Sequence, residues 1–139
     1  ILDRLNESDQ RAEALTPGEE IDFAHFFVTY MRHRLQLLDA NFQTFRAILP
    51  DILRNQTLGA RYYSPVVEPT FAIAERIFQG LIDQGVLKPH NPALVLRAIS
   101  SLVFGLLVTR MLGDPVTEAQ WDQFPEVIGA LILPGLIQN

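Results

Sequence analysis

The sequence predicts an all-α protein of about six helices in a single domain. Apolar residues recur at spacings of three and four along most of the chain, and almost no stretch alternates apolar and polar residues as a half-buried strand would. Prolines and glycines divide the chain into segments of helix length. The length of 139 residues is close to the commonest size of one domain, so we expect one core.

The composition excludes several classes of protein. Hydrophobic residues make up 48% of the chain, which excludes an intrinsically disordered protein. The chain has no Cys, which excludes disulfide frameworks, thiolate metal sites and cysteine nucleophiles. Its formal net charge is -5 and no segment forms a basic arm, so we expect it to bind a phosphate backbone poorly.

The first 40 residues predict two helices. Residues 1–15 are polar and charged, and we interpret them as the end of a longer connecting helix. Thr16, Pro17 and Glu19 then match a capping box with a first-turn proline. We therefore expect a second helix over roughly 17–39, and it should be mostly buried because apolar residues cover more than half of its circumference.

The middle of the chain predicts two further helical segments. The segment from Asn41 to about Tyr63 contains Pro50, so we expect a break or kink there and a restart at Asp51. Ser64-Pro65 should open the next helix. Gly85 should end that helix in the left-handed conformation.

Two apolar helices are expected at the end. Asn91-Pro92 should open a helix over 92–112, and Gly113-Asp114-Pro115 should stop it. Residues 117–120 match a second capping box and should start the last helix, whose end Pro134 disturbs. The uncharged stretches 98–109 and 127–139 are shorter than the ~18 residues of a membrane-spanning helix, so we expect core helices and no membrane span.

Several of these segments, in this order, resemble one family. Residues 80–87, followed by Asn91-Pro92 at the start of a long apolar helix with an inner Gly105, are similar to the ligand-binding half of TetR-type transcriptional regulators. The closing residues 131–136 continue the resemblance, and residues 48–53 resemble the short middle helix of that family.

The resemblance implies a fold, a function and partners. It implies an orthogonal helical bundle of the TetR C-terminal type, in which the last two helices pair with their copies as a dimeric four-helix bundle. Residues 1–139 would then be an effector-binding and dimerisation domain of a cytoplasmic repressor. DNA would be contacted only through an N-terminal helix-turn-helix domain that is missing from this chain.

The aromatic residues suggest a ligand pocket. Ten of the thirteen aromatic side chains fall within residues 23–78, in the company of tyrosines whose buried hydroxyls need partners. An apolar cavity with a few polar groups is what binds small molecules, so we expect an apolar or amphipathic effector. The alternative is that these rings are simply core. The expected pocket residues are Phe27, Tyr30, Met31, Phe45, Tyr62, Phe71, Phe78 and Phe104.

Charged groups near these rings leave alternatives open. Arg34 lies one turn beyond Tyr30, and Glu75 shares a helix with Phe71 and Phe78, so either could meet a charged ligand or lie on a solvated face. Arg97 and Arg110 flank an apolar helix centre and are most simply helix ends that reach water.

An excess of apolar residues on the last two helices predicts a homodimer. A fully intramolecular core is the alternative explanation for these side chains. The expected interface residues are Ile99, Leu102, Leu106, Ile128, Leu131 and Ile132.

No enzyme chemistry emerges from the sequence. Asp22 and His25 have the spacing of a helix-bundle metal site but lack the second pair that such a site requires. There is no glycine-rich phosphate loop and no nucleophile motif, so we expect no catalytic residue, metal or cofactor. The rival to a ligand sensor is a helical module that binds protein partners and has no small-molecule site.

Overall fold

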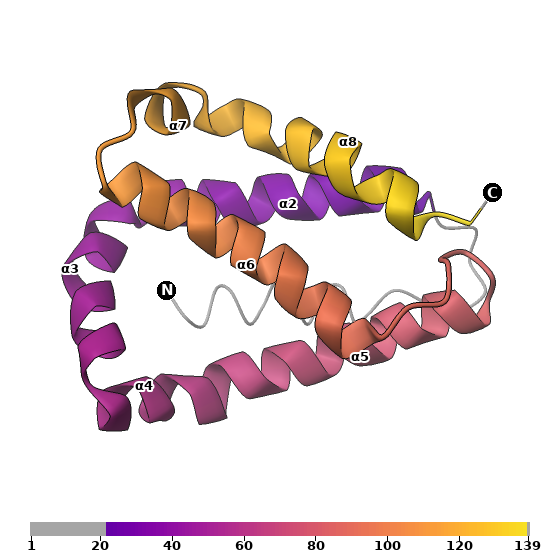
Figure 1. Cartoon of the computed structure of the whole chain (residues 1–139), viewed down its shortest axis with the longest axis horizontal. Coiled ribbons are helices and arrows are strands. Elements are labelled where there is room, and N and C mark those ends of the chain that lie inside the picture. The colour runs from indigo at the N-terminus through magenta and orange to yellow at the C-terminus, as the bar shows by residue number, and fades with distance from the viewer. Residues whose placement is uncertain (1–21, 139) are drawn as a thin grey trace.

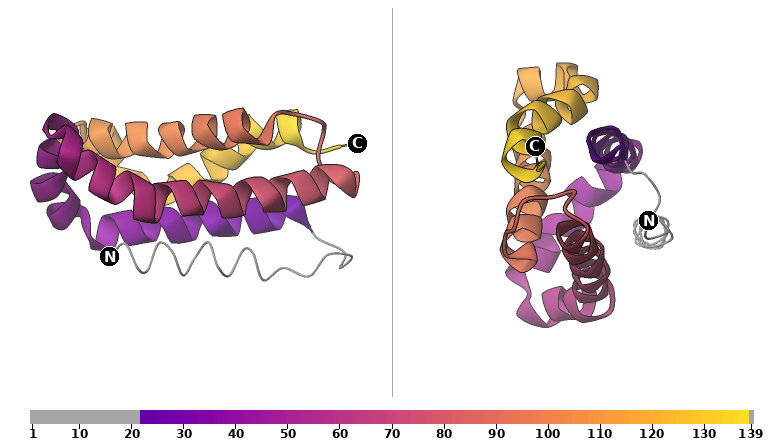
Figure 2. Two further views of the ribbon diagram at one scale, coloured as in Figure 1. Left: turned by 90° about the horizontal axis from the view of Figure 1, so that it is seen from below. Right: turned by 90° about the vertical axis from the view of Figure 1, so that its right-hand side faces the viewer.

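The chain folds into two packed pairs of helices joined across one end (Figure 1). The computed structural model describes residues 22–138, and within that range it contains no strand. α2 runs beside α8 and α5 runs beside α6, while α3 and α4 connect α2 to α5 (Figure 2). The helices are α2 (Phe23–Ala40), α3 (Phe42–Arg54), α4 (Gln56–Tyr62), α5 (Glu68–Asp83), α6 (Pro92–Met111), α7 (Pro115–Ala119) and α8 (Phe124–Leu136).

The first described helix starts later than the sequence predicts. α2 begins at Phe23 rather than near Pro17, because the Asp22 carboxylate accepts a hydrogen bond from the backbone N–H of His25 at 3.1 Å and so caps the helix. The carboxylate that could have formed a metal pair with His25 is therefore used as a cap. The expected connecting helix over 1–15 and the capping box at Thr16 lie outside the described residues.

Pro50 does not break its helix. α3 continues through Pro50 to Arg54, and the break falls at Asn55, whose backbone is extended and whose side chain caps α4 through the backbone N–H of Leu58 at 3.1 Å. A proline inside a helix removes one backbone hydrogen bond, and that loss is tolerated here on a helix that buries no residue fully. Asn55 offers both an extended backbone and a cap, and that combination ends the helix.

The entry to α5 also differs from the prediction. Ser64 and Pro65 do not open a new helix, because Tyr63–Val67 form a π-helical turn that runs from α4 directly into α5. A π turn is wider than an α turn, so it accommodates the Pro65 ring, which in an α-helix would clash with the carbonyl four residues earlier. Glu68 is therefore the first residue of α5, and Pro69 lies in its first turn.

The caps around α5 and α6 confirm the sequence prediction. Gly85 follows α5 with φ of 78°, and its N–H donates to the carbonyl of Ile82 at 3.0 Å. Asn91 caps α6 by accepting a hydrogen bond from the N–H of Ala93 at 3.1 Å. Gly113, with φ of 94°, follows the end of α6. Local chemistry alone specifies these positions.

The prediction that residues 117–120 form a capping box is wrong. Asp114 caps the short helix α7, accepting hydrogen bonds from the hydroxyl and then the backbone N–H of Thr117, and these bonds lower the pKa of the Asp114 carboxyl. Thr117 is buried rather than capping. A 3-10 turn over Trp121–Gln123 follows, and the last helix begins only at Phe124. It then continues past Pro134 to Leu136.

The core lies where α2 and α8 approach each other closely. Leu35 and Ile128 are each 1% exposed, and they come from these two helices. The approach depends on Gly129, because a Cβ atom there would lie 2.8 Å from a methyl group of Val28. The chain after α8 also pairs with the loop after α5, since Leu87 and Ile137 form an isolated antiparallel bridge.

The sequence suggests that Arg110 reaches water, but in the structure it does not. Its side chain is only 10% exposed and lies 2.9 Å from the Asp39 carboxylate at the end of α2. The guanidinium carbon lies 4.2 Å from the centre of the Phe42 ring and 4.9 Å from that of Trp121. Trp121 in turn donates its indole N–H to the carbonyl of Leu35 at 2.8 Å. Arg110 therefore joins the ends of α2 and α6 to the turn before α8.

α6 is the one described helix that is long and apolar enough to cross a membrane by length and composition. A helix that packs on protein passes the same test. Its two arginines form ion pairs with other helices, Arg97 with Glu75 of α5 and Arg110 with Asp39 of α2. These pairs favour a helix that packs within the bundle.

Candidate ligand pocket

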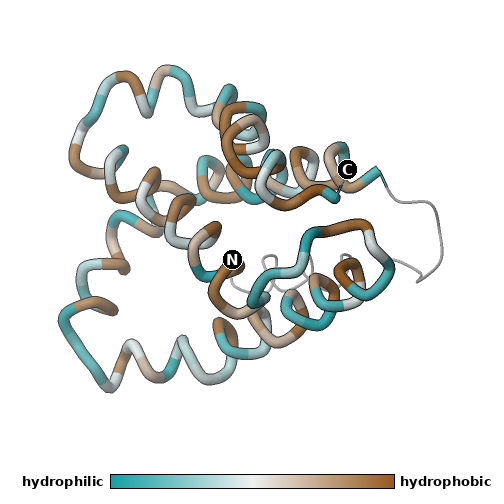
Figure 3. Tube along the Cα trace, turned by 45° about the vertical axis from the view of Figure 1, so that its right-hand side comes forward, coloured by the Kyte–Doolittle hydropathy of each residue, from teal (hydrophilic) through white to brown (hydrophobic). Residues whose placement is uncertain are grey.

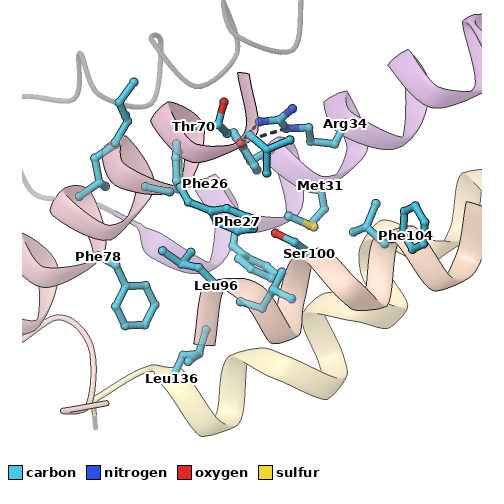
Figure 4. A pocket seen from close by; sticks show the side chains of 18 of the residues that line it. Phe26, Phe27, Met31, Arg34, Thr70, Phe78, Leu96, Ser100, Phe104 and Leu136 are labelled. Atoms are coloured by element: carbon cyan, nitrogen blue, oxygen red, sulfur yellow. Dashed lines mark hydrogen bonds between the residues drawn. The ribbon is translucent and has the colours of Figure 1, made fainter. Parts of the chain in front are cut away.

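A cavity of about 410 Å³ lies between α2, α5 and α6. The π turn contributes Val66 and Val67 to its wall, and the end of α8 contributes Leu136 (Figure 4). Cavities of about 300–1,000 Å³ with mostly apolar walls are typical of small-molecule sites. The size and walls of this cavity therefore suit a small apolar or amphipathic molecule.

Six of the eight residues expected at a pocket line this cavity. They are Phe27, Tyr30, Met31, Phe71, Phe78 and Phe104. Phe45 and Tyr62 are absent from the described wall, which corrects the sequence interpretation. Because the chain breaks at Asn55 and not at Pro50, α3 and α4 cross the end of the bundle (Figure 1), and α6 forms the wall expected from the third segment.

Apart from Phe104, the sequence did not identify the α6 part of the wall. Leu96, Ile99, Ser100 and Val103 line the cavity together with Phe104. α6 is apolar on nearly all sides, so its periodicity does not indicate which face turns inward. The small polar side chain of Ser100 within an apolar run was the available signal.

Four of the aromatic residues that line the cavity come from α2. Phe23, Phe26, Phe27 and Tyr30 follow one another at spacings of three and four residues, and their neighbouring ring centres lie 6.0 to 6.2 Å apart in tilted pairs. Residues at these spacings share a helix face, so α2 presents a continuous aromatic surface to the cavity.

The polar groups of the wall gather around Tyr30. Arg34 donates to the Tyr30 hydroxyl through Nη2 at 2.6 Å and through Nε at 3.0 Å. Figure 4 shows Thr70 of α5 beside these groups and Ser100 of α6 farther along the cavity. Of the two charged groups that the sequence left open, Arg34 is therefore the one at the pocket.

Glu75 is bound elsewhere. Its carboxylate lies 2.8 Å from Nη1 of Arg97, and the Arg97 guanidinium lies 4.5 Å from the centre of the Phe71 ring. The hydrogen bond that Arg97 donates to the Glu75 carboxylate raises the pKa of the Arg97 guanidinium. Glu75 is not among the described residues that line the cavity.

Exposed apolar side chains lie on α6 and α8, which share one side of the molecule in the right-hand view of Figure 2. Hydrophobic positions follow both helices in Figure 3. Leu131 is 70% exposed and Leu94 is 66% exposed. Leu102, Leu106 and Ile132 are half-buried.

Two residues expected at a dimer interface are not at the surface. Ile99 faces the cavity and Ile128 packs against α2, and both are buried within one chain. Ile99 is 7% exposed and Ile128 is 1% exposed, so neither can contribute much area against a second copy, which corrects these two assignments. The regular spacing that suggested them does not distinguish the inner face of an apolar helix from its outer face.

Comparison with solved structures shows a TetR-like fold. The chain is similar to a putative TetR-family transcriptional regulator from Mesorhizobium loti, with a TM-score of 0.72 and 17% sequence identity. The match covers 98% of this chain and 71% of that one. No protein-family model matches the chain, and no curated protein matches it.

Proposed function

We propose that residues 1–139 form the effector-binding and dimerisation domain of a TetR-like transcriptional regulator, and that the cavity between α2, α5 and α6 binds its effector. The observation that carries this proposal is a cavity of about 410 Å³ with an aromatic wall inside a TetR-like fold. An apolar or amphipathic small molecule suits that wall.

A regulatory role fits the residues of the cavity better than an enzymatic one. Its described wall contains no carboxylate, no histidine and no lysine, so it offers no general acid or base at neutral pH apart from tyrosine. Residues 22–138 contain no group of three or more potential metal ligands. These features support a site that binds a ligand without transforming it.

The exposed apolar side chains support a homodimer. A second copy that covers the α6 and α8 surface, including Leu94 and Leu131, would remove these side chains from water. Large apolar surfaces of this kind mark protein contacts in soluble proteins. DNA contact would belong to a separate domain, since the net charge of this chain is -5. Such a regulator acts in the cytoplasm.

The ligand would act through α6. Ile99, Ser100 and Val103 line the cavity, and the same helix carries Leu94 on the exposed surface. A ligand shifts a dimer between two arrangements only by its difference in affinity for them. The alternative, a module that binds protein partners without a small molecule, would leave the cavity without a role.

The test is to fill the cavity. Ala74 of α5 lines it, whereas Ala72 on the same helix is exposed and does not. Ala74→Phe should abolish the rise in Tm that apolar ligands produce, because the added ring occupies their space. Ala72→Phe is the matched control and should preserve that rise in Tm. Ligand binding stabilises the folded protein by about 2.7 kcal/mol when the ligand is in hundredfold excess over Kd. Equal ligand responses in both variants would place binding outside the cavity.

A further inference from the structure

One end of the cavity is closed. Phe78 and Leu81 of α5, and Leu136 at the end of α8, line the cavity and are all buried. Figure 4 shows Phe78 and Leu136 toward one end of the cavity and Phe104 toward the other. Because the side chains at the closed end are apolar, a polar group placed there would lose its water without gaining a hydrogen bond from them. The closed end therefore favours the apolar part of a ligand.

The other end of the cavity is open to water. Of the lining residues that the structure describes, three are exposed, namely Val67, Ser100 and Phe104. Val67 belongs to the π turn before α5 and is 36% exposed, and Phe104 of α6 is 43% exposed. Ser100 lies about one turn before Phe104 on the same helix. The exposed lining residues come from two segments, which places the opening between the π turn and α6.

Contacts between α5 and α6 mark one edge of this opening. Nη1 of Arg97 on α6 lies 2.8 Å from the Glu75 carboxylate of α5, and the guanidinium carbon lies 4.5 Å from the centre of the Phe71 ring. Arg97 lies about one turn before Ser100, and Phe71 lies about one turn after Val67. The Arg97 contacts therefore join the two helices next to the opening and limit it on that side.

On the basis of the proposed function, we infer that the effector is an amphipathic molecule that enters between the π turn and α6 with its apolar end first. Its apolar end binds at Phe78 and Leu136, and its polar group stays at the opening, where the Ser100 hydroxyl and water form its hydrogen bonds. A polar group that keeps its water loses little solvation free energy, so the site selects the apolar part of the ligand. The polar group can then be larger than the cavity would admit.

The test compares two probes that carry the same apolar chain, decanol and decyl maltoside, both below the concentration at which they form micelles. The disaccharide is too bulky to share a cavity of about 410 Å³ with the decyl chain. Calorimetry should nevertheless show that decyl maltoside displaces decanol and binds within about tenfold of it, because the disaccharide stays outside. Ala74→Phe should abolish binding of both probes, which places the chain in the cavity, and Ala72→Phe should preserve it.

Substitutions at the opening test where the polar group lies. Ser100→Trp narrows the opening and should weaken decyl maltoside by at least about tenfold more than it weakens decanol. Ala72→Trp places the same side chain at an exposed position of α5 outside the cavity wall, and it should weaken neither probe. Val67→Trp narrows the opening from the other side and should give the same difference, which provides the test if Ser100→Trp does not fold.

The outcomes separate the two proposals. If decanol binds in the cavity and decyl maltoside does not displace it, the effector-binding function stands and the inferred orientation is overturned. Equal losses of the two probes in Ser100→Trp and Val67→Trp would overturn the orientation as well, because the disaccharide would then not lie at the opening. If neither probe binds, or if Ala74→Phe leaves the binding of both unchanged, both proposals fail.

Discussion

Replacing Arg110 separates the contribution of its charge from that of its packing. Its guanidinium is enclosed by the rings of Phe42 and Trp121, and Nη2 lies 2.9 Å from the Asp39 carboxylate. Nε and Nη1 are buried and have no hydrogen-bond partner among the described residues. We expect Arg110→Met to be nearly neutral and Arg110→Ala to be strongly destabilising.

The magnitudes follow from these contacts. Two cation–π contacts contribute about 0.5–2 kcal/mol each, and the ion pair contributes about 0–1 kcal/mol because the Asp39 side chain is 53% exposed. Two buried donors without partners cost about 1–3 kcal/mol each. The favourable and unfavourable contributions of the charged group nearly cancel. Methionine, which keeps an apolar side chain between the rings, should therefore change the free energy of unfolding by less than about 1.5 kcal/mol.

Alanine removes the packing as well as the charge. It leaves a gap between the two rings, and loss of a long buried side chain costs about 2–4 kcal/mol. Urea unfolding of both variants at one fixed protein concentration measures the difference, and the fixed concentration matters for a dimer. If Arg110→Met costs as much as Arg110→Ala, the charge itself stabilises the fold and this reasoning is wrong.

Three further predictions concern other parts of the chain. Gly129→Ala should be less stable than Gly80→Ala by about 1–3 kcal/mol in urea unfolding. A Cβ at Gly129 would lie 2.8 Å from Val28, whereas one at Gly80 would meet nothing within 4 Å. Equal stabilities of the two variants would show that α2 and α8 move apart freely. The lowered pKa of Asp114 in the folded protein means that its carboxylate stabilises the fold fully above about pH 4, and that this stability is lost as the pH falls through the folded pKa. Asp114→Asn should therefore lose less stability than the wild type on acidification, as measured by Tm against pH. Leu131→Asp should convert a dimer to a monomer in analytical ultracentrifugation. Leu53→Asp is the control and should not, since Leu53 is 66% exposed on α3 and lies outside the proposed interface. A wild-type protein that is monomeric at a concentration on the order of tens of micromolar would contradict the dimer, because an obligate interface should be occupied there.

The features that could be predicted from the sequence are those that depend on local chemistry. Gly85 and Asn91 end and begin their helices because a left-handed glycine and a side-chain cap act within a few residues. The apolar face of α2 could also be predicted, because Phe23, Phe27 and Met31 recur at spacings of four residues. Most of the cavity wall on α2 follows from that spacing.

The features that could not be predicted depend on a choice between competing local signals or on contacts between distant segments. Pro50 has the local properties of a helix breaker, but the break is decided by Asn55, which caps the next helix. Thr117 matches a capping box, but the nearby Asp114 is the stronger acceptor and takes the role. Ile128 is regularly spaced on an apolar helix, and only the approach of α2 to Gly129 shows that it faces inward.

In the proposed function, α6 would couple the pocket to the interface. Ion pairs join α6 to the other two walls of the cavity, Arg97 to Glu75 of α5 and Arg110 to Asp39 of α2. Under the proposed function, a ligand that separates α2 from α5 would displace at least one end of α6. Because Leu94 lies on the exposed surface of the same helix, the surface that we propose for a second copy would move with it. A tenfold difference in ligand affinity between two such arrangements supplies about 1.4 kcal/mol, which is within the usual range of coupling between distinct sites.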